Sequence, residues 1–427
     1  MENYRLRIAD SILDEYLDAL GAVLIEGPKA CGKTTTAEQH AKSILYMDDP
    51  AHKEQFLQMA DSNISNLLEG ETPHMIDEWQ LAPKLWDAIR FTVDHRQEDG
   101  QFILTGSAVP FTNHGEISHT GTGRFAWLKM RPMSLWESGD SNGTISLSSL
   151  FEQEDKPFGA KCEMSMERLA FLTCRGGWPK SLDKKTENAA LLQVRVYLQA
   201  VVRSDISRVD DVERNPDRAL RLLKIYARHQ GASVSIATIA KDLEANEAVT
   251  PSVITVDSYL NALRKIFVIE DMPAWNPNLR SKTAIRTSDT RYFVDPSIAV
   301  AALGLGPKDL INDLNTFGLL FETMCVRDLR VYADALGGTV YHYRDKNGLE
   351  CDAVVHLRNG SYGLVEIKLG GDKLVAEGAA SLLKLASKID TTKMKAPSFM
   401  MVLTGVGEYA YQRTDGVFVV PVGCLKD

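Results

Sequence analysis

The amino-acid sequence predicts an α/β protein made of several domains, and three observations support this prediction. First, residues 21–47 hold an apolar run, a glycine turn and a helix-favouring stretch in that order. Second, apolar side chains recur at helical spacing through the middle of the chain. Third, alternating apolar runs separated by turns that contain Asn-Gly fill much of the last third. These patterns predict an α/β domain at each end of the chain and helical domains between them.

The composition is that of an ordinary globular protein: 44% of the 427 residues are hydrophobic and 25% are charged, and this length predicts two to four domains. No run approaches the roughly 18 apolar residues of a membrane span, and the start has no apolar signal segment. We therefore expect a cytoplasmic protein without a membrane partner.

The six cysteines are scattered, which argues against a disulfide framework or a zinc site. A net charge of −9 argues against an extensive DNA-binding surface but allows a local basic patch.

The glycine turn fits the phosphate-loop pattern G-x-x-x-x-G-K-[ST]. Its glycines allow backbone N–H groups to turn towards phosphates, and the helix that follows adds its dipole. We expect Lys33 to reach the β and γ oxygens and Thr34 to bind Mg²⁺. The pattern predicts an ATP and Mg²⁺ site whose nucleotide contacts are Gly27, Pro28, Lys29, Ala30, Cys31, Gly32, Lys33, Thr34 and Thr35.

Two later apolar strands also end in polar side chains. The strand in TPHMIDEWQ ends at Asp77 and Glu78, which we assign to Mg²⁺ and to the attacking water, respectively. The alternative is a pair of solvated charges at the start of the next helix. The strand in QFILTGS ends at Thr105 and Ser107, and if it is inserted between the other two strands, Thr105 can sense the γ-phosphate.

The middle of the chain, residues 213–300, predicts a winged helix. The expected helices cover residues 216–231, 236–244 and 256–266, and the strands of the wing cover residues 266–275 and 290–296. The third helix and the wing would present Asn261, Arg264, Lys265, Arg280, Lys282 and Arg286. Ten Lys or Arg against eight Asp or Glu between residues 216 and 290 leave a balance of +2. This balance is compatible with phosphate contacts, but such modules also serve as packing and regulatory elements, so DNA contact is one of two alternatives.

The last third has the expected element order αβββαββ. The helices cover residues 317–336 and 377–389, and the strands cover residues 340–344, 349–357, 362–369, 398–406 and 415–422. Asp352 lies in the second strand, and Glu366 and Lys368 end the third. This order, with acidic residues at those positions, resembles the PD-(D/E)XK restriction-endonuclease-like fold.

The resemblance implies a metal-dependent hydrolytic site. Asp352 and Glu366 would share Mg²⁺, Glu322 on the preceding helix would add a metal contact, and Lys368 would orient or deprotonate the attacking water. The alternative is a salt-bridge network, with Lys368 and Arg344 as the cations, on a scaffold that does not cut nucleic acid.

Taken together, the sequence resembles the AAA-type ATPases, and specifically a widespread prokaryotic group of predicted ATPases with a C-terminal restriction-endonuclease-like domain. The resemblance runs through GPKACGKTT, MIDEWQ, ILTGSA, TGRFAWLKMRPMSLWE, GGWP and ECD…VEIK, and covers nearly the whole chain. It implies that Arg124 contacts the γ-phosphate in the same chain or from a neighbouring subunit of a homo-oligomer. The alternative is that Arg124 is an ordinary surface arginine. It further implies that a helix over residues 187–206 closes a lid over the nucleotide.

We therefore expect four domains. They are an AAA-type ATPase core (1–137), a linker and helical lid (138–212), a winged helix (213–300) and a restriction-endonuclease-like domain (301–427), with residues 138–160 as a loop or linker. The expected function is ATP-dependent control of a module that acts on nucleic acid, most simply DNA. One rival is a nucleotide-dependent regulatory switch or scaffold whose C-terminal domain binds without cleaving. Another is a motor or DNA-remodelling subunit.

Overall fold

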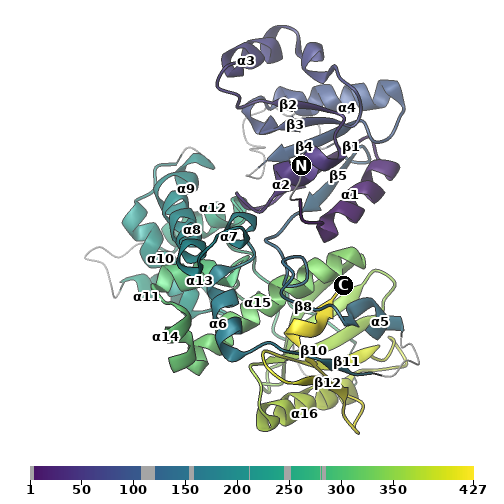
Figure 1. Ribbon diagram of the computed structural model, residues 1–427, viewed down its shortest axis with the longest axis vertical. Helices are drawn as coiled ribbons and strands as arrows, with labels where there is room; N and C mark the ends of the chain where they lie inside the picture. Colours follow the sequence, from purple (N-terminus) through teal and green to yellow (C-terminus); the bar gives the residue numbers. More distant parts are fainter. Residues whose placement is uncertain are drawn as a thin grey trace. The chain divides into compact units, whose positions relative to one another are not determined.

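The computed structural model describes residues 4–106, 121–152, 158–210, 212–244, 252–278, 280 and 285–427 (Figure 1). Ser107 and Lys282 lie outside these ranges. The chain forms two compact units. The first contains the residues up to Arg131 with two short segments, Val209–Asp211 and Lys265–Phe267, and the second contains Pro132–Arg208, Val212–Arg264 and Val268–Asp427. The finer boundaries at residues 138, 213 and 301 stay a prediction.

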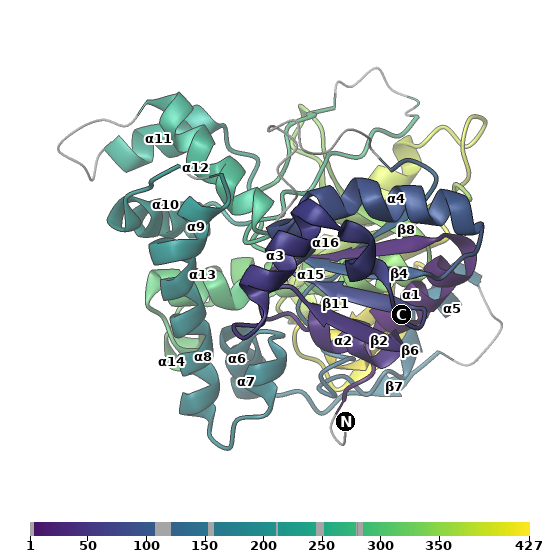
Figure 2. The same cartoon turned by 90° about the horizontal axis from the view of Figure 1, so that it is seen from above.

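The first unit contains a parallel five-stranded sheet in the order β2-β3-β4-β1-β5. The strands are β1 (Ala22–Glu26), β2 (Ser43–Tyr46), β3 (His74–Asp77), β4 (Phe102–Gly106) and β5 (Phe125–Lys129), and the helices are α1 (Ile8–Ala19), α2 (Lys33–His40), α3 (Lys53–Ser62) and α4 (Lys84–Arg96). Helix α4 covers one face of the sheet (Figure 2), through a core that includes Leu24, Ile76 and Trp86. The inserted position of β4 between β1 and β3 is confirmed. The carboxyl ends of these three strands therefore meet at one edge of the sheet.

The first part of the second unit is helical. Its helices are α6 (Met166–Arg175), α7 (Pro179–Leu182), α8 (Glu187–Ala200), α9 (Ile206–Arg208), α10 (Pro216–Arg228), α11 (Ile236–Glu244), α12 (Val253–Lys265), α13 (Pro296–Leu303) and α14 (Pro307–Asn312), with a π-helical turn at Val201–Asp205. The three helices predicted for the winged helix are present as α10, α11 and α12. The two strand-like runs after them meet through antiparallel bridges between Ile269 and Phe293 and between Met272 and Thr290.

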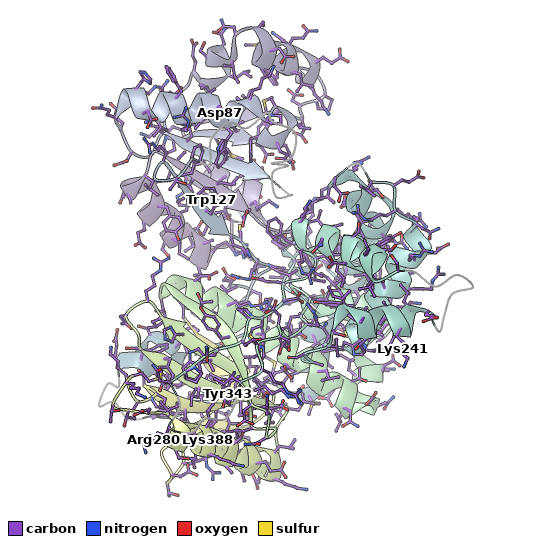
Figure 3. The ribbon with its side chains drawn as sticks, turned by 180° about the vertical axis from the view of Figure 1, so that it is seen from behind. Asp87, Trp127, Lys241, Arg280, Tyr343 and Lys388 are labelled. Atoms are coloured by element: carbon purple, nitrogen blue, oxygen red, sulfur yellow. The ribbon has the colours of Figure 1, made fainter. Side chains whose placement is uncertain are left out.

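The loop predicted as the tip of the wing is attached to the C-terminal domain. Ala274 and Ile285 form bridges with His342 and Asp345. Arg280 donates its backbone N–H to the carbonyl of Lys388 at 2.7 Å, and Figure 3 shows these two residues together. Arg264 of α12, predicted to face outward, instead pairs with Asp271 at 2.7 Å. The ion pair leaves Arg264 less available to a ligand than the sequence predicts, whereas Arg280 stays exposed.

The C-terminal domain has the predicted element order, with two additional short strands, β12 and β14. Its elements are α15 (Leu314–Ala335), β8 (Gly338–Arg344), β9 (Glu350–Leu357), β10 (Tyr362–Lys368), α16 (Asp372–Lys388), β11 (Phe399–Thr404), β12 (Tyr409–Gln412), β13 (Phe418–Pro421) and β14 (Leu425–Lys426). Seven strands form a sheet in the order β7-β12-β13-β11-β10-β9-β8, in which β7 is Ala160–Lys161. Helix α16 packs its apolar face, including Leu382 and Leu385, on the strands. The sheet therefore holds β9 and β10, which carry the predicted acidic residues, side by side.

The prediction that residues 138–160 are only a loop or linker is wrong. This segment contains β6 (Ile145–Ser146) and α5 (Leu147–Glu152), and β7 begins at its end. Strand β6 pairs in parallel with β14, and β7 pairs with β12. Ile145, Leu147 and Leu150 are buried. Because the partners are C-terminal strands, no local periodicity in this polar stretch could reveal the pairing.

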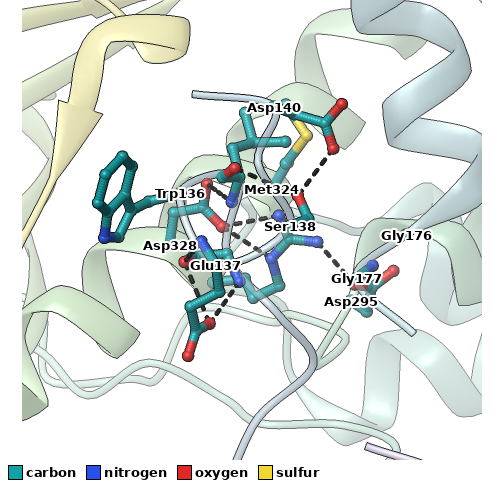
Figure 4. Close-up of polar contacts among 12 residues, drawn as sticks. Trp136, Glu137, Ser138, Asp140, Gly176, Gly177, Asp295, Met324 and Asp328 are labelled. Atoms are coloured by element: carbon teal, nitrogen blue, oxygen red, sulfur yellow. Dashed lines mark hydrogen bonds and ion pairs between the residues drawn. The ribbon is translucent and has the colours of Figure 1, made fainter. Parts of the chain in front are cut away.

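A buried polar network joins four segments of the second unit (Figure 4). Arg327 of α15 lies 2.8 Å from Asp295 and 2.7 Å from Asp328. Asp295 also accepts the backbone N–H of Gly177 at 3.0 Å, and Asp328 that of Leu135 at 3.1 Å. The MRPMSLWE and GGWP motifs therefore have a structural role, since they help to satisfy buried charges that are costly when unpaired.

Among the described residues, no helix combines the length and the apolar composition that crossing a bilayer requires.

Candidate functional site

The phosphate loop follows β1 and turns through three residues with positive φ: Gly27 (150°), Ala30 (62°) and Gly32 (108°). A Cβ at Gly27 would lie 2.1 Å from the carbonyl oxygen of Met130, so this position admits only glycine. Gly32 is the N-cap of α2, which places the positive end of the helix at the loop. The backbone is therefore shaped as a phosphate-binding loop requires.

Lys33 and Thr34 occupy the first turn of α2. The ammonium of Lys33 is buried and donates hydrogen bonds to the carbonyls of Gly27 and Pro28, both at 2.9 Å. The hydroxyl of Thr34 donates to a carboxylate oxygen of Asp77 at 3.1 Å. The lysine thus lies inside the loop, where a phosphate oxygen can replace the two carbonyls.

Asp77 ends β3 and is buried between two hydroxyl groups. The same oxygen that accepts the Thr34 bond also accepts a hydrogen bond from Thr105, the partner of Asp77 in β4. Burial raises the pKa of Asp77, although the hydrogen bonds from Thr105 and Thr34 act in the opposite direction. Hydroxyl and carboxylate oxygens suit Mg²⁺ chemically. The structure therefore brings Thr34, Asp77 and Thr105 together, with Thr105 bonded to Asp77 instead of open to solvent.

Glu78 lies next to this group and has a left-handed backbone, with φ 50° and ψ 41°. Its carboxylate accepts a hydrogen bond from the side-chain amide of Gln80. A Cβ at Gly106, the last residue of β4, would lie 2.7 Å from the side-chain oxygen of Gln80. Gln80 is a site residue that the sequence reasoning missed, and its position two residues after Glu78 is the signal that could have identified it.

Arg124 lies at the opposite edge of the sheet from the phosphate loop. Its carbonyl accepts the backbone N–H of Ala22, the first residue of β1, whereas the loop follows Glu26, the last. A strand of five residues separates these edges by about 16 Å. The guanidinium pairs with Asp94 at 2.7 Å. Contact between Arg124 and a γ-phosphate in the same chain does not fit this geometry, and contact from a neighbouring subunit stays a prediction.

Arg7 is a second residue that the sequence reasoning missed. It is buried and donates to the carbonyl of Cys31 in the phosphate loop at 2.9 Å and to that of Arg131 at 2.8 Å. The guanidinium thus ties the loop to the chain after β5. A lone arginine before a helix gives no sequence signal for such a contact.

The predicted acidic residues of the C-terminal domain do converge on Lys368. Its ammonium lies 3.0 Å from Asp352 and 2.7 Å from Glu366. Asp352 also accepts the backbone N–H of Ile367 at 2.7 Å, which fixes its carboxylate over the end of β10. Arg344, the other cation predicted for a salt-bridge network, pairs instead with Glu350 at 2.9 Å.

Glu322 of α15 belongs to the same electrostatic group. Its carboxylate accepts a hydrogen bond from Tyr292, and a Cβ at Gly231 would lie 2.7 Å from the same oxygen. Burial, with the charge of Asp352, raises the pKa of Glu322 to about 8. The same two causes raise the pKa of Glu366 to about 8. Burial alone would lower the pKa of Lys368, but the two carboxylates outweigh it and raise that pKa.

This arrangement is an ion-paired cluster. Carboxylate oxygens are suitable ligands for Mg²⁺ or Mn²⁺. However, within the described part of the chain no three His, Cys, Asp or Glu side chains are gathered closely enough to hold a metal ion. The ammonium of Lys368 lies between Asp352 and Glu366. The carboxylate oxygens are therefore chemically suited to a hard divalent cation. Their positions, however, are those of ion pairs with Lys368.

Comparison with known families divides the chain into three parts. Residues 20–138 match the AAA domain family, residues 166–309 match a domain of unknown function (DUF8612), and residues 317–425 match another (DUF4143). Two uncharacterized proteins, Mb2031c of Mycobacterium bovis and Rv2008c of Mycobacterium tuberculosis, are each 23% identical over 422 residues, which are 97% of this chain and 83% of theirs.

Among solved structures, the chain is similar to the Walker-type ATPase PABY2304 of Pyrococcus abyssi, with a TM-score of 0.43, 15% identity, and coverage of 70% of this chain and 96% of that one. It is also similar to AMPPCP-bound DnaA of Aquifex aeolicus, with a TM-score of 0.29, 12% identity, and coverage of 60% and 86%. The family match over residues 20–138 agrees with the geometry of the loop, of Lys33 and of Asp77. The amino-terminal part of this chain therefore matches the AAA domain family and has the geometry of a phosphate-binding loop.

Proposed function

We propose that this chain is a Mg²⁺-dependent ATPase whose nucleotide state controls a winged-helix and nuclease-like module that acts on nucleic acid, with DNA as the expected substrate. The observation that carries the ATPase part is the convergence of Lys33, Thr34, Asp77 and Thr105 at the end of a glycine-shaped loop. This is the set of groups that phosphoryl transfer requires, because that chemistry depends on positioning and on charge stabilisation.

In the proposed hydrolysis, Lys33 would exchange its bonds to Gly27 and Pro28 for bonds to phosphate oxygens. Thr34 and Asp77 would hold Mg²⁺, which when bound would neutralise charge on the phosphates. Glu78 would accept a hydrogen bond from the attacking water, in competition with the one that Gln80 donates to the same carboxylate. Gln80 would thereby restrain the basal rate of the domain.

The nuclease-like part of the proposal rests on the cluster around Lys368. Carboxylates at this depth are costly unless cations balance them. Here, one lysine faces two carboxylates directly, and Glu322 adds a third acidic group. Asp352, Glu366 and Glu322 would hold a divalent cation that activates water, and Lys368 would orient that water.

A second candidate function is a regulatory switch or scaffold whose C-terminal domain binds without cleaving. The ion pairs of Lys368 with both Asp352 and Glu366 favour it, because the ammonium already lies between the two carboxylates. The hydrogen bond from the Arg280 guanidinium to Thr391 favours it too, since it engages a predicted DNA contact of the wing within the chain.

One experiment separates the two functions. ATP hydrolysis and cleavage of mixed DNA and RNA substrates are measured in a single Mg²⁺ or Mn²⁺ titration for the wild type, Lys33→Ala and Asp352→Ala. Asp415→Ala is the control, because this acid lies in the turn between β12 and β13. Two strands, β13 and β11, separate β12 from β10, so the substitution should not affect the acidic cluster.

The proposed function requires that Lys33→Ala removes ATP hydrolysis and that Asp352→Ala removes cleavage while ATP hydrolysis persists. If the wild type hydrolyses ATP but cuts no substrate at any metal concentration, the switch replaces the nuclease. If the wild type does not hydrolyse ATP at all, the ATPase part of the proposal fails.

A further inference from the structure

Two thiols that the proposed function does not use meet where β7 ends and β14 begins. Cys162 follows β7 directly, and Cys424 precedes β14 directly. The sulfur of Cys424 lies 3.5 Å from the carbonyl of Lys161, and a Cβ built on Gly423 would lie 3.0 Å from the sulfur of Cys162. Each sulfur thus lies against the chain neighbour of the other cysteine. The two thiols lie close enough for each to shift the pKa of the other.

The backbone holds this pair in place independently of the sulfur atoms. Cys162 donates its N–H to the carbonyl of Glu408 at 2.8 Å. Asn142 donates its backbone N–H to Gly423 at 2.8 Å and its side-chain amide to Lys161 at 2.9 Å. Asn142 therefore clamps the residues next to both cysteines. A disulfide forms only where the backbone already brings the sulfurs together, and this site meets that requirement.

One of the two thiols borders a pocket. The pocket has a volume of about 480 Å³ and is lined by Asn142, Lys161, Cys162, Arg168 and Gly423, among others. Cys424 is fully buried and does not line it. A small polar oxidant can therefore approach Cys162 from the pocket, whereas the pocket does not expose Cys424.

The pKa values of the two thiols also favour Cys162 as the one that is oxidised first. The hydrogen bond from Cys424 lowers the pKa of Cys162 more than burial raises it. That hydrogen bond and burial both raise the pKa of Cys424. The thiolate is the reactive form of cysteine, so Cys162 is the group that an oxidant attacks first.

We propose that Cys162 and Cys424 form a reversible intrachain disulfide when the protein meets a peroxide. The Cys162 thiolate attacks one peroxide oxygen, the O–O bond breaks, and the departing oxygen takes up a proton to become water, which leaves a sulfenic acid. The Cys424 thiol then gives up its proton and attacks the sulfur of Cys162, and the S–O bond breaks with loss of a second water. Two thiols lose two electrons, and the peroxide gains them.

The bond would fasten the segment after the AAA domain to the end of the C-terminal domain. Strand β6 pairs with β14 and β7 pairs with β12 through two residues each, so these pairings are short. A covalent link beside them would restrict their opening, since a cross-link between distant residues limits the open ensemble. Oxidation of the two thiols would therefore restrict the motion of β6, β7 and β14 before that of other strands.

The test uses the full chain, treated with hydrogen peroxide, alkylated in denaturant and mapped by mass spectrometry without reduction. We expect a peptide pair that joins Cys162 to Cys424, a loss of two titratable thiols per chain, and recovery of both after dithiothreitol. Cys424→Ser should stop at a sulfenic acid on Cys162 that dimedone traps. Cys174→Ala, which removes a buried thiol of α6, should still form the bond.

Absence of the Cys162–Cys424 peptide from oxidised, still folded wild-type protein would overturn the proposal. So would a product in which either cysteine is joined to another chain. Mapping of the wild type decides the matter even where a variant fails to fold, and it does not depend on ATP hydrolysis or on cleavage.

Discussion

The hydroxyl of Tyr292 donates a hydrogen bond to the carboxylate of Glu322, which links a strand-like run in the middle of the chain to the first helix of the C-terminal domain. Tyr292 is 1% exposed. The bond lowers the pKa of Glu322 against the larger effect of burial. The middle segment therefore helps to set the orientation and charge of one of the three predicted metal contacts.

We expect Tyr292→Phe to destabilise the protein by about 1–3 kcal/mol, because it leaves a buried carboxyl without its donor. If Glu322 contacts a metal ion, the same change should weaken Mn²⁺ binding by roughly 10-fold. Chemical unfolding and calorimetric Mn²⁺ titration measure the two effects.

The matched control is Tyr343→Phe, since the buried hydroxyl of Tyr343 has no hydrogen-bond partner among the described residues (Figure 3). It should leave stability unchanged or raise it slightly. Equal effects of the two substitutions would show that the bond to Glu322 has no special importance.

Gln80→Ala should raise basal ATP hydrolysis several-fold, because it removes the hydrogen bond that the Gln80 amide donates to the Glu78 carboxylate. Glu78→Gln should lower hydrolysis by about 10²-fold or more, as expected for loss of a general base. Both are read from steady-state phosphate release at saturating ATP. A fall in rate with Gln80→Ala would mean that Gln80 holds Glu78 in its productive orientation.

Arg124→Ala should change ATP hydrolysis by less than twofold in a monomeric preparation, because this arginine lies at the far edge of the sheet and pairs with Asp94. An exposed pair of this kind contributes about 0–1 kcal/mol to stability. Hydrolysis is measured over a range of protein concentrations, with Asp94→Ala as the control. A loss on the order of 10³-fold that appears only when chains assemble would assign Arg124 to the site of a neighbouring subunit.

Glu366 should make stability depend on pH. Burial, together with the charge of Asp352, raises its pKa from 4.5 to about 8, so the folded state holds this proton more tightly than the unfolded state. Its contribution to the free energy of unfolding is therefore complete below pH 4.5 and is lost as the pH rises through 8.

Glu366→Gln, which stays neutral, should reduce this decline by roughly 1 kcal/mol per pH unit. Urea unfolding between pH 5 and pH 8 in a chelating buffer measures it, with Glu377→Gln on the exposed face of α16 as the control. Parallel curves for the variant and the wild type would show that Glu366 titrates normally.

The sequence predicts the local features of this protein well. The phosphate loop, β3, β4 and the order of elements from α15 to β11 follow from glycine positions and from apolar periodicity, which depend on neighbouring residues. The meeting of Asp352, Glu366 and Lys368 also follows, because strand alternation and a tight turn are enough to place them.

What the sequence does not reveal depends on distant contacts. Arg7 reaches the phosphate loop, and Tyr292 reaches Glu322, only after folding. The position of Arg124 is clear only once β5 is seen to pair with β1 from its first residue. Likewise, Arg264 has the spacing of an outward-facing residue, but an acid seven positions later, Asp271, draws it into an internal ion pair.

The pairing of β6 with β14 has a consequence for synthesis of the chain. The five strands of the amino-terminal sheet are all complete by Lys129, so that sheet can form while the ribosome is still at work. Strand β6, in contrast, has its partner at Leu425–Lys426 and must wait unpaired until almost the whole chain has emerged. Translation thus imposes an order on folding, and a fragment that begins at residue 301 would lack the strands β6 and β7 that its own sheets require.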